Sequence, residues 1–137
     1  MDDKTLVAAA FEAREHAYTP YSHWAVGAAL LTSDGTVYGG CNIENAAYTP
    51  SNCAERTAFF RALYDGHHSF EAIAVVGGPE GQEAPDFCAP CGVCRQVMRE
   101  FCSLDDFRII LGRSDGQMRT YTLRELLPES FGPENLA

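Results

Sequence analysis

Three cysteines and one glutamate have the types and spacing of a catalytic metal site. Cys53 and Glu55 lie in the stretch Cys-Ala-Glu-Arg, and Cys91 and Cys94 lie later in the chain in the stretch Pro-Cys-Gly-Val-Cys. Thiolates are soft ligands that suit zinc, and a zinc ion with three protein ligands keeps its fourth position open for water. We therefore predict that Cys53, Cys91 and Cys94 bind one Zn²⁺. Glu55 would then carry protons beside the metal instead of binding it.

Two other kinds of site could use the same cysteines. A structural zinc normally has four protein ligands, and Cys88, three residues before Cys91, could be the fourth. Glu55 would then have no role at the metal. A redox pair is the second alternative, but a thioredoxin-like Cys-x-x-Cys follows a strand near the start of its fold. Here the motif lies in the second half of the chain, so we favour the catalytic zinc.

The segments around these residues resemble those of one family, the small homotetrameric cytidine deaminases. The similar segments are NIENAAY at 42–48, NCAERTA at 52–58 and PCGVCRQV at 90–97. The paired Cys-x-Glu and Pro-Cys-x-x-Cys motifs are also similar to the general signature of zinc deaminases. The resemblance runs from YTPYS at 18–22 to LLPESF at 126–131. It implies zinc-dependent hydrolysis of cytidine and 2′-deoxycytidine to uridine and 2′-deoxyuridine, with release of ammonia.

The resemblance also implies roles for residues near the metal. Deamination at C4 of cytosine needs an activated water, a proton on N3 and a proton on the departing amino group. Zinc lowers the pKa of water toward neutrality, and Glu55 is implied to move the protons. Asn42 and Glu44 are implied to hold the ribose hydroxyls, for which an amide and a carboxylate are suitable partners. Ala54 is implied to offer backbone hydrogen bonds to the base.

Further residues are implied to shape a site shared between subunits. Trp24 stands where the family usually has a phenylalanine that packs on the pyrimidine ring; an indole can also stack but is bulkier. The alternative is that Trp24 only plugs the start of a strand. Phe131 matches a C-terminal aromatic that closes the site of an adjacent subunit. Ala46 and Tyr48 match residues that contact ribose from a neighbouring subunit, so the resemblance implies a homotetramer.

Two arginines directly follow the predicted ligands. Three thiolates on one zinc ion leave a net charge of about −1, which makes bound water less acidic than a histidine-ligated zinc would. Arg56 and Arg95 could compensate by donating hydrogen bonds to the cysteine sulfurs, as groups behind metal ligands often do. The alternative is that both are surface arginines on acidic helices.

Composition limits the partners of this chain. Its net charge is −9, with ten Lys and Arg residues against nineteen Asp and Glu. This balance repels polyanions, so we expect no binding to nucleic acid, acidic membranes or nucleotide phosphates, and favour a neutral nucleoside. The 137 residues suffice for a single domain spanning 1–137. No signal peptide is evident, so we expect a cytoplasmic protein whose six cysteines are not a disulfide scaffold.

Hydrophobic spacing predicts an α/β domain with helices on both sides of a mixed sheet. Asp34-Gly35 and Asp115-Gly116 are typical of tight hairpins. We expect helices at 3–18, 53–64 and 91–101, a short helix capped by Thr122, and strands at 26–31, 37–41, 72–76, 108–111 and 118–121. The resembled family has a three-layer α/β/α sandwich around a five-stranded sheet, which agrees with this order of elements.

Three other functions stay open at this point. Blasticidin S deaminases carry similar motifs on the same fold, although NIENAAY and LLPESF favour the free nucleoside. A non-catalytic zinc module, acting through an oligomer surface, would need the metal but not Glu55. A deaminase that edits RNA or DNA is the third alternative, and the net charge of −9 argues against it.

Overall fold

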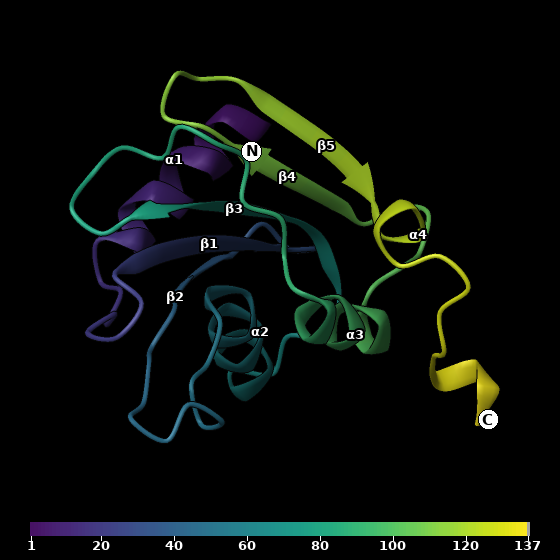
Figure 1. The fold of residues 1–137 in the computed structure, drawn as a ribbon. Helices are drawn as coiled ribbons and strands as arrows, with labels where there is room; N and C mark the ends of the chain where they lie inside the picture. The colour runs from purple at the N-terminus through teal and green to yellow at the C-terminus, as the bar shows by residue number, and fades with distance from the viewer. Residues whose placement is uncertain (137) are drawn as a thin grey trace.

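The strands form one sheet in the order β2-β1-β3-β4-β5 (Figure 1). The structure is a computed structural model that describes residues 1–136. The strands are β1 (Trp24–Thr32), β2 (Val37–Cys41), β3 (Phe70–Pro79), β4 (Arg108–Gly112) and β5 (Met118–Thr122). β3 and β4 pair in parallel, and the other neighbouring strands are antiparallel. The sheet is therefore mixed, as the sequence predicts.

Helices cover both faces of the sheet. α1 (Asp3–Arg14) lies on one face, and α2 (Ala54–Tyr64) and α3 (Gly92–Phe101) lie on the other (Figure 1). Successive strand residues point to opposite faces, so Leu30 and Ile73 pack with α2 and α3 while Leu31 and Ala72 pack with α1. The predicted three-layer α/β/α fold is confirmed. α4 (Leu123–Leu126) and a short 3-10 helix (Pro133–Asn135) follow β5.

The first helix is shorter than the sequence pattern suggests. It ends at Arg14 instead of residue 18. The backbone of Tyr18 pairs with the loop after β2: its N–H donates to the Asn42 carbonyl and its carbonyl accepts from the Glu44 N–H, both at 2.9 Å. This long-range pairing takes Tyr18 out of the helix. β3 extends beyond the predicted 72–76 because β1 pairs along nearly all of it.

α2 approaches β2 very closely, and this approach sets the position of its first turn. A Cβ atom at Gly40 would lie 2.3 Å from the carbonyl oxygen of Ala54 and 2.6 Å from the nitrogen of Ala58. Atoms cannot come this close, so only a residue without a Cβ allows the contact. Cys53 is the N-cap of α2 and Cys91 is the N-cap of α3. Each helix therefore begins directly after its cysteine, one residue later than predicted.

α3 also holds the segment that follows α4. Arg99 is buried, donates from Nε to Ser130 Oγ at 2.8 Å and forms an ion pair with Glu134. Gln96 Nε2 donates to the carbonyl oxygen of Phe131 at 2.9 Å. The ring of Phe131 is nevertheless 58% exposed. The segment is fixed to α3 while its aromatic side chain stays at the surface.

Two further features concern the chain as a whole. All six cysteines have free thiols. Among residues 1–136, no helix combines the length and the apolar character needed to cross a membrane.

Candidate metal centre

The side chains of Cys53, Cys91 and Cys94 meet where α2 and α3 begin. The Sγ atom of Cys91 lies 3.8 Å from that of Cys53 and 3.6 Å from that of Cys94. All three sulfurs lie within 4.8 Å of one another. Cys94 is buried and Cys91 is exposed, so the cluster is open on one side. The two helix starts are neighbours because α2 and α3 pack on the same face of the sheet.

This spacing fits a tetrahedral zinc ion. With Zn–S bonds of about 2.3 Å, tetrahedral geometry places two sulfur ligands about 3.8 Å apart. Thiolates also favour zinc over magnesium and calcium, which take oxygen ligands. Among the described residues, Cys88 does not belong to the cluster. Its sulfur packs against Gly77 instead, where an added Cβ would lie only 2.7 Å away, which disfavours the four-cysteine structural zinc.

Two thiols of the cluster, Cys53 and Cys94, have pKa values shifted in opposite directions. The pKa of Cys53 is lowered to about 5 because its thiolate accepts a hydrogen bond from Cys94 and is stabilised by the guanidinium of Arg56. The pKa of Cys94 is raised, since its thiol donates that hydrogen bond and is buried. A divalent cation would displace the remaining thiol protons, so metal binding should release protons.

Glu55 is a buried carboxyl group beside the cluster. Its side chain is only 4% exposed although it belongs to the first turn of α2. Burial raises the pKa of Glu55 to about 7, and the negative charge of Cys53 adds to this increase. An exposed first-turn glutamate would keep an ordinary pKa. The position of Glu55 is thus consistent with a group that takes and returns protons near neutral pH.

The two arginines after the ligands have different partners. Arg56 Nη2 donates to Cys53 Sγ at 3.3 Å, as predicted from its position after the ligand. Arg95 instead donates from Nε to the Pro90 carbonyl oxygen and from Nη1 to the Leu126 carbonyl oxygen, both at 2.7 Å. Arg95 therefore connects the loop before Cys91 to the end of α4, while Arg56 stabilises the Cys53 sulfur directly.

We predict that Arg56→Gln weakens zinc binding roughly tenfold to a hundredfold, because a hydrogen bond from a cation to a ligand sulfur is lost. Competition with a chromogenic zinc chelator measures this change. Arg61→Gln is the matched control, since Arg61 lies in the same helix but donates to the Gly39 carbonyl oxygen instead of a sulfur. Equal zinc affinities for the two variants would show that Arg56 does not support the metal site.

Trp24 lies at the start of the long strand β1. It pairs with Pro79 at the end of β3. Burial raises the pKa of the Cys88 thiol, and the negative charges of Glu55 and Cys53 raise it further. A hydrogen bond from the Trp24 side chain acts in the opposite direction and lowers this pKa. Cys88 is therefore close to both Trp24 and the metal cluster. The indole is 42% exposed in this chain.

Asn42 and Glu44 both bind the segment that carries Trp24. Asn42 Oδ1 accepts from the Val26 N–H at 2.9 Å, and Asn42 Nδ2 donates to the Trp24 carbonyl oxygen at 2.8 Å. Glu44 Oε1 accepts from the backbone N–H groups of Tyr21 and Ser22, each at 3.0 Å. The hydroxyl of Ser22 donates to Glu44 Oε2. These hydrogen bonds, with that of the Ser22 hydroxyl foremost, lower the pKa of Glu44.

The remaining predicted residues occupy varied positions. Ala54 is buried and is the first residue of α2, where a backbone N–H has no partner within the helix. Ala46 and Tyr48 lie in the exposed loop after β2, and Tyr48 has a positive φ of 29°. Phe131 is exposed on the tail segment. One chain thus brings together the cysteines, Glu55 and Arg56, and leaves Tyr48 and Phe131 at its surface.

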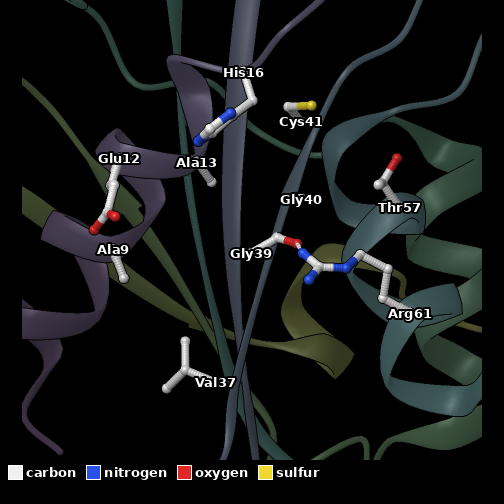
Figure 2. A pocket seen from close by; sticks show the side chains of 10 residues that line it. All are labelled: Ala9, Glu12, Ala13, His16, Val37, Gly39, Gly40, Cys41, Thr57 and Arg61. Carbon is white, nitrogen blue, oxygen red and sulfur yellow. Dashed lines mark hydrogen bonds between the residues drawn. The ribbon is translucent and has the colours of Figure 1, made fainter. Parts of the chain in front are cut away.

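A separate cavity of about 470 Å³ lies along the open edge of β2. α1 contributes Ala9, Glu12 and Ala13, and the turn after α1 contributes His16; β2 contributes Val37, Gly39, Gly40 and Cys41, and α2 contributes Thr57 and Arg61 (Figure 2). Figure 2 shows the Arg61 guanidinium reaching across to the backbone of Gly39. None of the predicted site residues lines this cavity, so it does not belong to the candidate metal centre.

The fold and the cysteine cluster together define a zinc-binding deaminase domain. The family described as "Cytidine and deoxycytidylate deaminase zinc-binding region" matches residues 1–109, and the chain belongs to this family. The cytidine deaminase of Sporosarcina psychrophila is 50% identical over 137 residues, which covers 100% of this chain and 96% of that protein. The cytidine deaminase of Halalkalibacterium halodurans is 48% identical, over 99% of this chain and 98% of that protein.

Solved structures support the same assignment. The crystal structure of cytidine deaminase from Burkholderia pseudomallei has a TM-score of 0.86 and 48% identity, covering 96% of this chain and 100% of that chain. The cytidine deaminase of Mycobacterium tuberculosis has a TM-score of 0.80 and 36% identity, covering 96% and 98% respectively. The family resemblance and the zinc cofactor predicted from the sequence are thereby confirmed.

Ser22 and Cys88 are not among the site residues predicted from the sequence. The sequence offers Cys88 as a possible fourth metal ligand and Ser22 as part of the YTPYS segment. Their contacts join residues that are distant in the sequence, such as Ser22 with Glu44. Residue spacing does not predict the contact between Ser22 and Glu44, because it depends on how the loop after β2 folds back.

Proposed function

We propose that this protein is a zinc-dependent hydrolase that converts cytidine and 2′-deoxycytidine to uridine and 2′-deoxyuridine with release of ammonia. The observation that carries the proposal is a buried carboxyl group, Glu55, beside three sulfurs whose separations fit zinc. Family membership and the relatives named above support the same substrate class. The net charge of −9 favours a neutral nucleoside over a nucleotide or a nucleic acid.

In this proposal the protein groups divide the proton transfers and the binding between them. When held by Cys53, Cys91 and Cys94, zinc supplies Lewis-acid activation of a water molecule near neutral pH. Glu55 takes a proton from the attacking water and delivers it to N3 of the base. Glu55 then moves the second proton of that water, from the oxygen now bonded to C4, to the amino group, so that the C4–N bond breaks, ammonia leaves and a carbonyl remains. Burial favours the acid form of Glu55 and a nearby cation favours its carboxylate, which lets both forms take part.

Substrate binding is assigned to groups around this centre. Trp24 stacks on the pyrimidine, and the free backbone N–H at Ala54 is positioned to donate to the base. Asn42 keeps one N–H and one lone pair free after its two hydrogen bonds, so it can still bind a sugar hydroxyl. Glu44 offers a carboxylate to another hydroxyl. The exposed indole and the partly exposed polar groups fit a ligand with one aromatic and one polar half.

The test is to measure ammonia release and the change in ultraviolet absorbance with cytidine, 2′-deoxycytidine, cytosine, CMP and blasticidin S, together with zinc content. We expect turnover of the two nucleosides with about one zinc per chain. Turnover of blasticidin S in preference to cytidine would replace the proposed substrate. A zinc-loaded protein that turns over none of these compounds would favour a non-catalytic zinc module.

We further propose that the active form is a homotetramer in which neighbouring chains complete each site. Support comes from large apolar side chains left exposed on one chain: Tyr18, Tyr21, Trp24, Ile43, Tyr48 and Phe131. Tyr21 and Tyr48 contact each other edge to face, with ring centroids 6.0 Å apart. Exposed apolar groups of this kind are typical of protein interfaces. The backbone of Phe131 is bonded to Gln96 of α3 while its side chain stays exposed, which suits a residue offered to another chain.

Mixing two defective variants tests whether the sites are shared. We expect Phe131→Ala to lower kcat/KM roughly tenfold, because an aromatic contact with substrate is lost. In assemblies re-formed from equal amounts of Phe131→Ala and Glu55→Gln chains, about a quarter of the sites would regain both side chains. Activity should then exceed the sum of the separate variants several-fold. Strictly additive activity after verified subunit exchange would mean that each chain supplies its own Phe131.

We also propose that residues 1–137 act as one domain in the cytoplasm. The single five-stranded sheet supports the first point, since both ligand-bearing helices pack on it. The six free thiols support the second, because such thiols persist in a reducing compartment.

A further inference from the structure

Ser22 links two groups that the proposed function assigns to different parts of the substrate. Its hydroxyl donates to Glu44 Oε2, the carboxylate assigned to the sugar. The Ser22 Oγ atom also accepts a hydrogen bond at 3.0 Å from the backbone N–H of Trp24, the residue assigned to the base. Two successive hydrogen bonds thus connect Trp24 through Ser22 to Glu44.

Nearly all hydrogen-bonding positions of the Glu44 carboxylate are occupied. A carboxylate has about four lone-pair positions. Oε1 of Glu44 accepts from the Tyr21 and Ser22 backbone N–H groups, and Oε2 accepts from the Ser22 hydroxyl. One position therefore remains on Oε2. Since the Ser22 hydroxyl has only one hydrogen and gives it to Glu44, the remaining position of Oε2 has a defined direction.

This arrangement borders an open cavity of about 350 Å³. Tyr21, Ser22, Glu44, Tyr48 and Ser51 line it. A sugar hydroxyl that enters the cavity can donate to the remaining lone pair of Oε2 without displacing any existing hydrogen bond. Successive hydrogen bonds also strengthen one another. Binding of a sugar hydroxyl to Glu44 and the position of the Trp24 backbone should therefore depend on each other.

We propose that Ser22 is a positioning residue for nucleoside recognition: its hydroxyl orients Glu44 toward one secondary hydroxyl of the sugar and ties that carboxylate to the backbone of Trp24. This inference rests on the proposed function, because it takes a nucleoside as the ligand. Ser22 has no contact with the cysteine cluster or Glu55 among the described hydrogen bonds, so it acts on binding and not on the proton transfers.

Trp24 provides a direct measurement of this role, because it is the single tryptophan of the chain. Quenching of its fluorescence gives the dissociation constants of uridine and of 2′,3′-dideoxyuridine, which lacks both secondary hydroxyls. We expect Ser22→Ala to weaken uridine binding about tenfold, as expected for a hydrogen bond to a charged group. Binding of 2′,3′-dideoxyuridine should change less than about twofold. In turnover of cytidine, KM should rise in parallel while kcat stays nearly constant.

Two control variants separate this role from a general effect on the loop. Ser22→Thr keeps the hydroxyl on an exposed residue and should restore selective uridine binding. Ser51 lines the same cavity, but its hydroxyl accepts from the Asn45 N–H and does not contact Glu44. Ser51→Ala should therefore alter the binding of both ligands by the same factor. Equal weakening of uridine and 2′,3′-dideoxyuridine in Ser22→Ala would overturn the inference.

Failure of the inference can be distinguished from failure of the proposed function. Fluorescence titration reports binding even if no substrate is turned over, so an absence of deamination overturns only the proposed reaction. If Glu44→Gln removes the preference for uridine over the dideoxy compound but Ser22→Ala preserves it, the role of Ser22 is wrong. If wild-type protein binds neither ligand, the nucleoside site and the role of Ser22 both fail.

Discussion

Replacement of Glu55 by glutamine is expected to lower kcat for cytidine by about a thousandfold or more while the protein still binds zinc. Loss of a group that both accepts and donates protons in one reaction costs roughly a hundredfold to ten-thousandfold. Glutamine has nearly the same shape but cannot transfer protons. Steady-state rates, zinc content and the thermal unfolding midpoint of the purified variant give the three quantities needed.

The stability of this variant has an expected sign. Glu55 is buried, and burial raises its pKa to about 7, which means that the folded state disfavours the charged carboxylate. A neutral glutamine avoids that unfavourable burial, so the unfolding midpoint should not decrease. Glu100→Gln is a matched control on α3, since Glu100 is exposed. Wild-type turnover in zinc-loaded Glu55→Gln would refute the proton-transfer role, and reduced zinc content would instead indicate a ligand.

Cys94→Ser is the second change with a large expected effect. Cys94 is 1% exposed and lies with its sulfur in the cluster. Serine is close in size, but its hydroxyl is a hard and weakly acidic donor that zinc binds poorly. We expect zinc content to fall from about one per chain to well below half, and activity to become undetectable. Zinc analysis and turnover assays measure both effects.

The same variant should also lose its metal-dependent stability. A ligand that binds only the folded state raises the free energy of unfolding in proportion to the logarithm of its concentration over its dissociation constant, about 2.7 kcal/mol at a hundredfold excess. Wild-type protein should therefore melt at a lower temperature after chelation, whereas Cys94→Ser should not respond to the chelator. Cys102→Ser is the control, because Cys102 is also a buried, free cysteine at the end of α3. Loss of zinc from both variants would show that the cluster is not the binding site.

Local sequence patterns predict most of the fold and the composition of the cluster. Apolar spacing, the two Asp-Gly turns and the cap at Thr122 indicate all five strands and all four α-helices of the described residues within a few residues, but not the 3-10 helix Pro133–Asn135. The ligands could be predicted because zinc chemistry restricts their types, and Cys-x-x-Cys places two sulfurs in one helical turn. The capping box at Thr122 and Glu125 is also present, with the Thr122 N–H donating to Glu125 Oε1 at 2.8 Å.

Properties that depend on tertiary contacts could not be predicted in the same way. The end of α1 depends on the pairing of Tyr18 with the loop after β2, far along the chain. Arg95 follows a ligand just as Arg56 does, yet it binds carbonyl oxygens because Pro90 and Leu126 lie within its reach. The spacing to Cys53 identifies Glu55 as a candidate, but its burial, and with it the raised pKa, depends on how α2 packs on the sheet.

The placement of two thiols on separate helix starts has a consequence for handling the protein. Cys53 and Cys91 belong to different helices, yet their sulfurs lie 3.8 Å apart, and Cys91 is exposed. Because the packed core holds both helices, the thiols stay close after the metal is removed. An oxidant can then join them as a disulfide, which removes two ligands at once. Chelation in air should therefore cause inactivation that added zinc reverses only after a reductant has been supplied.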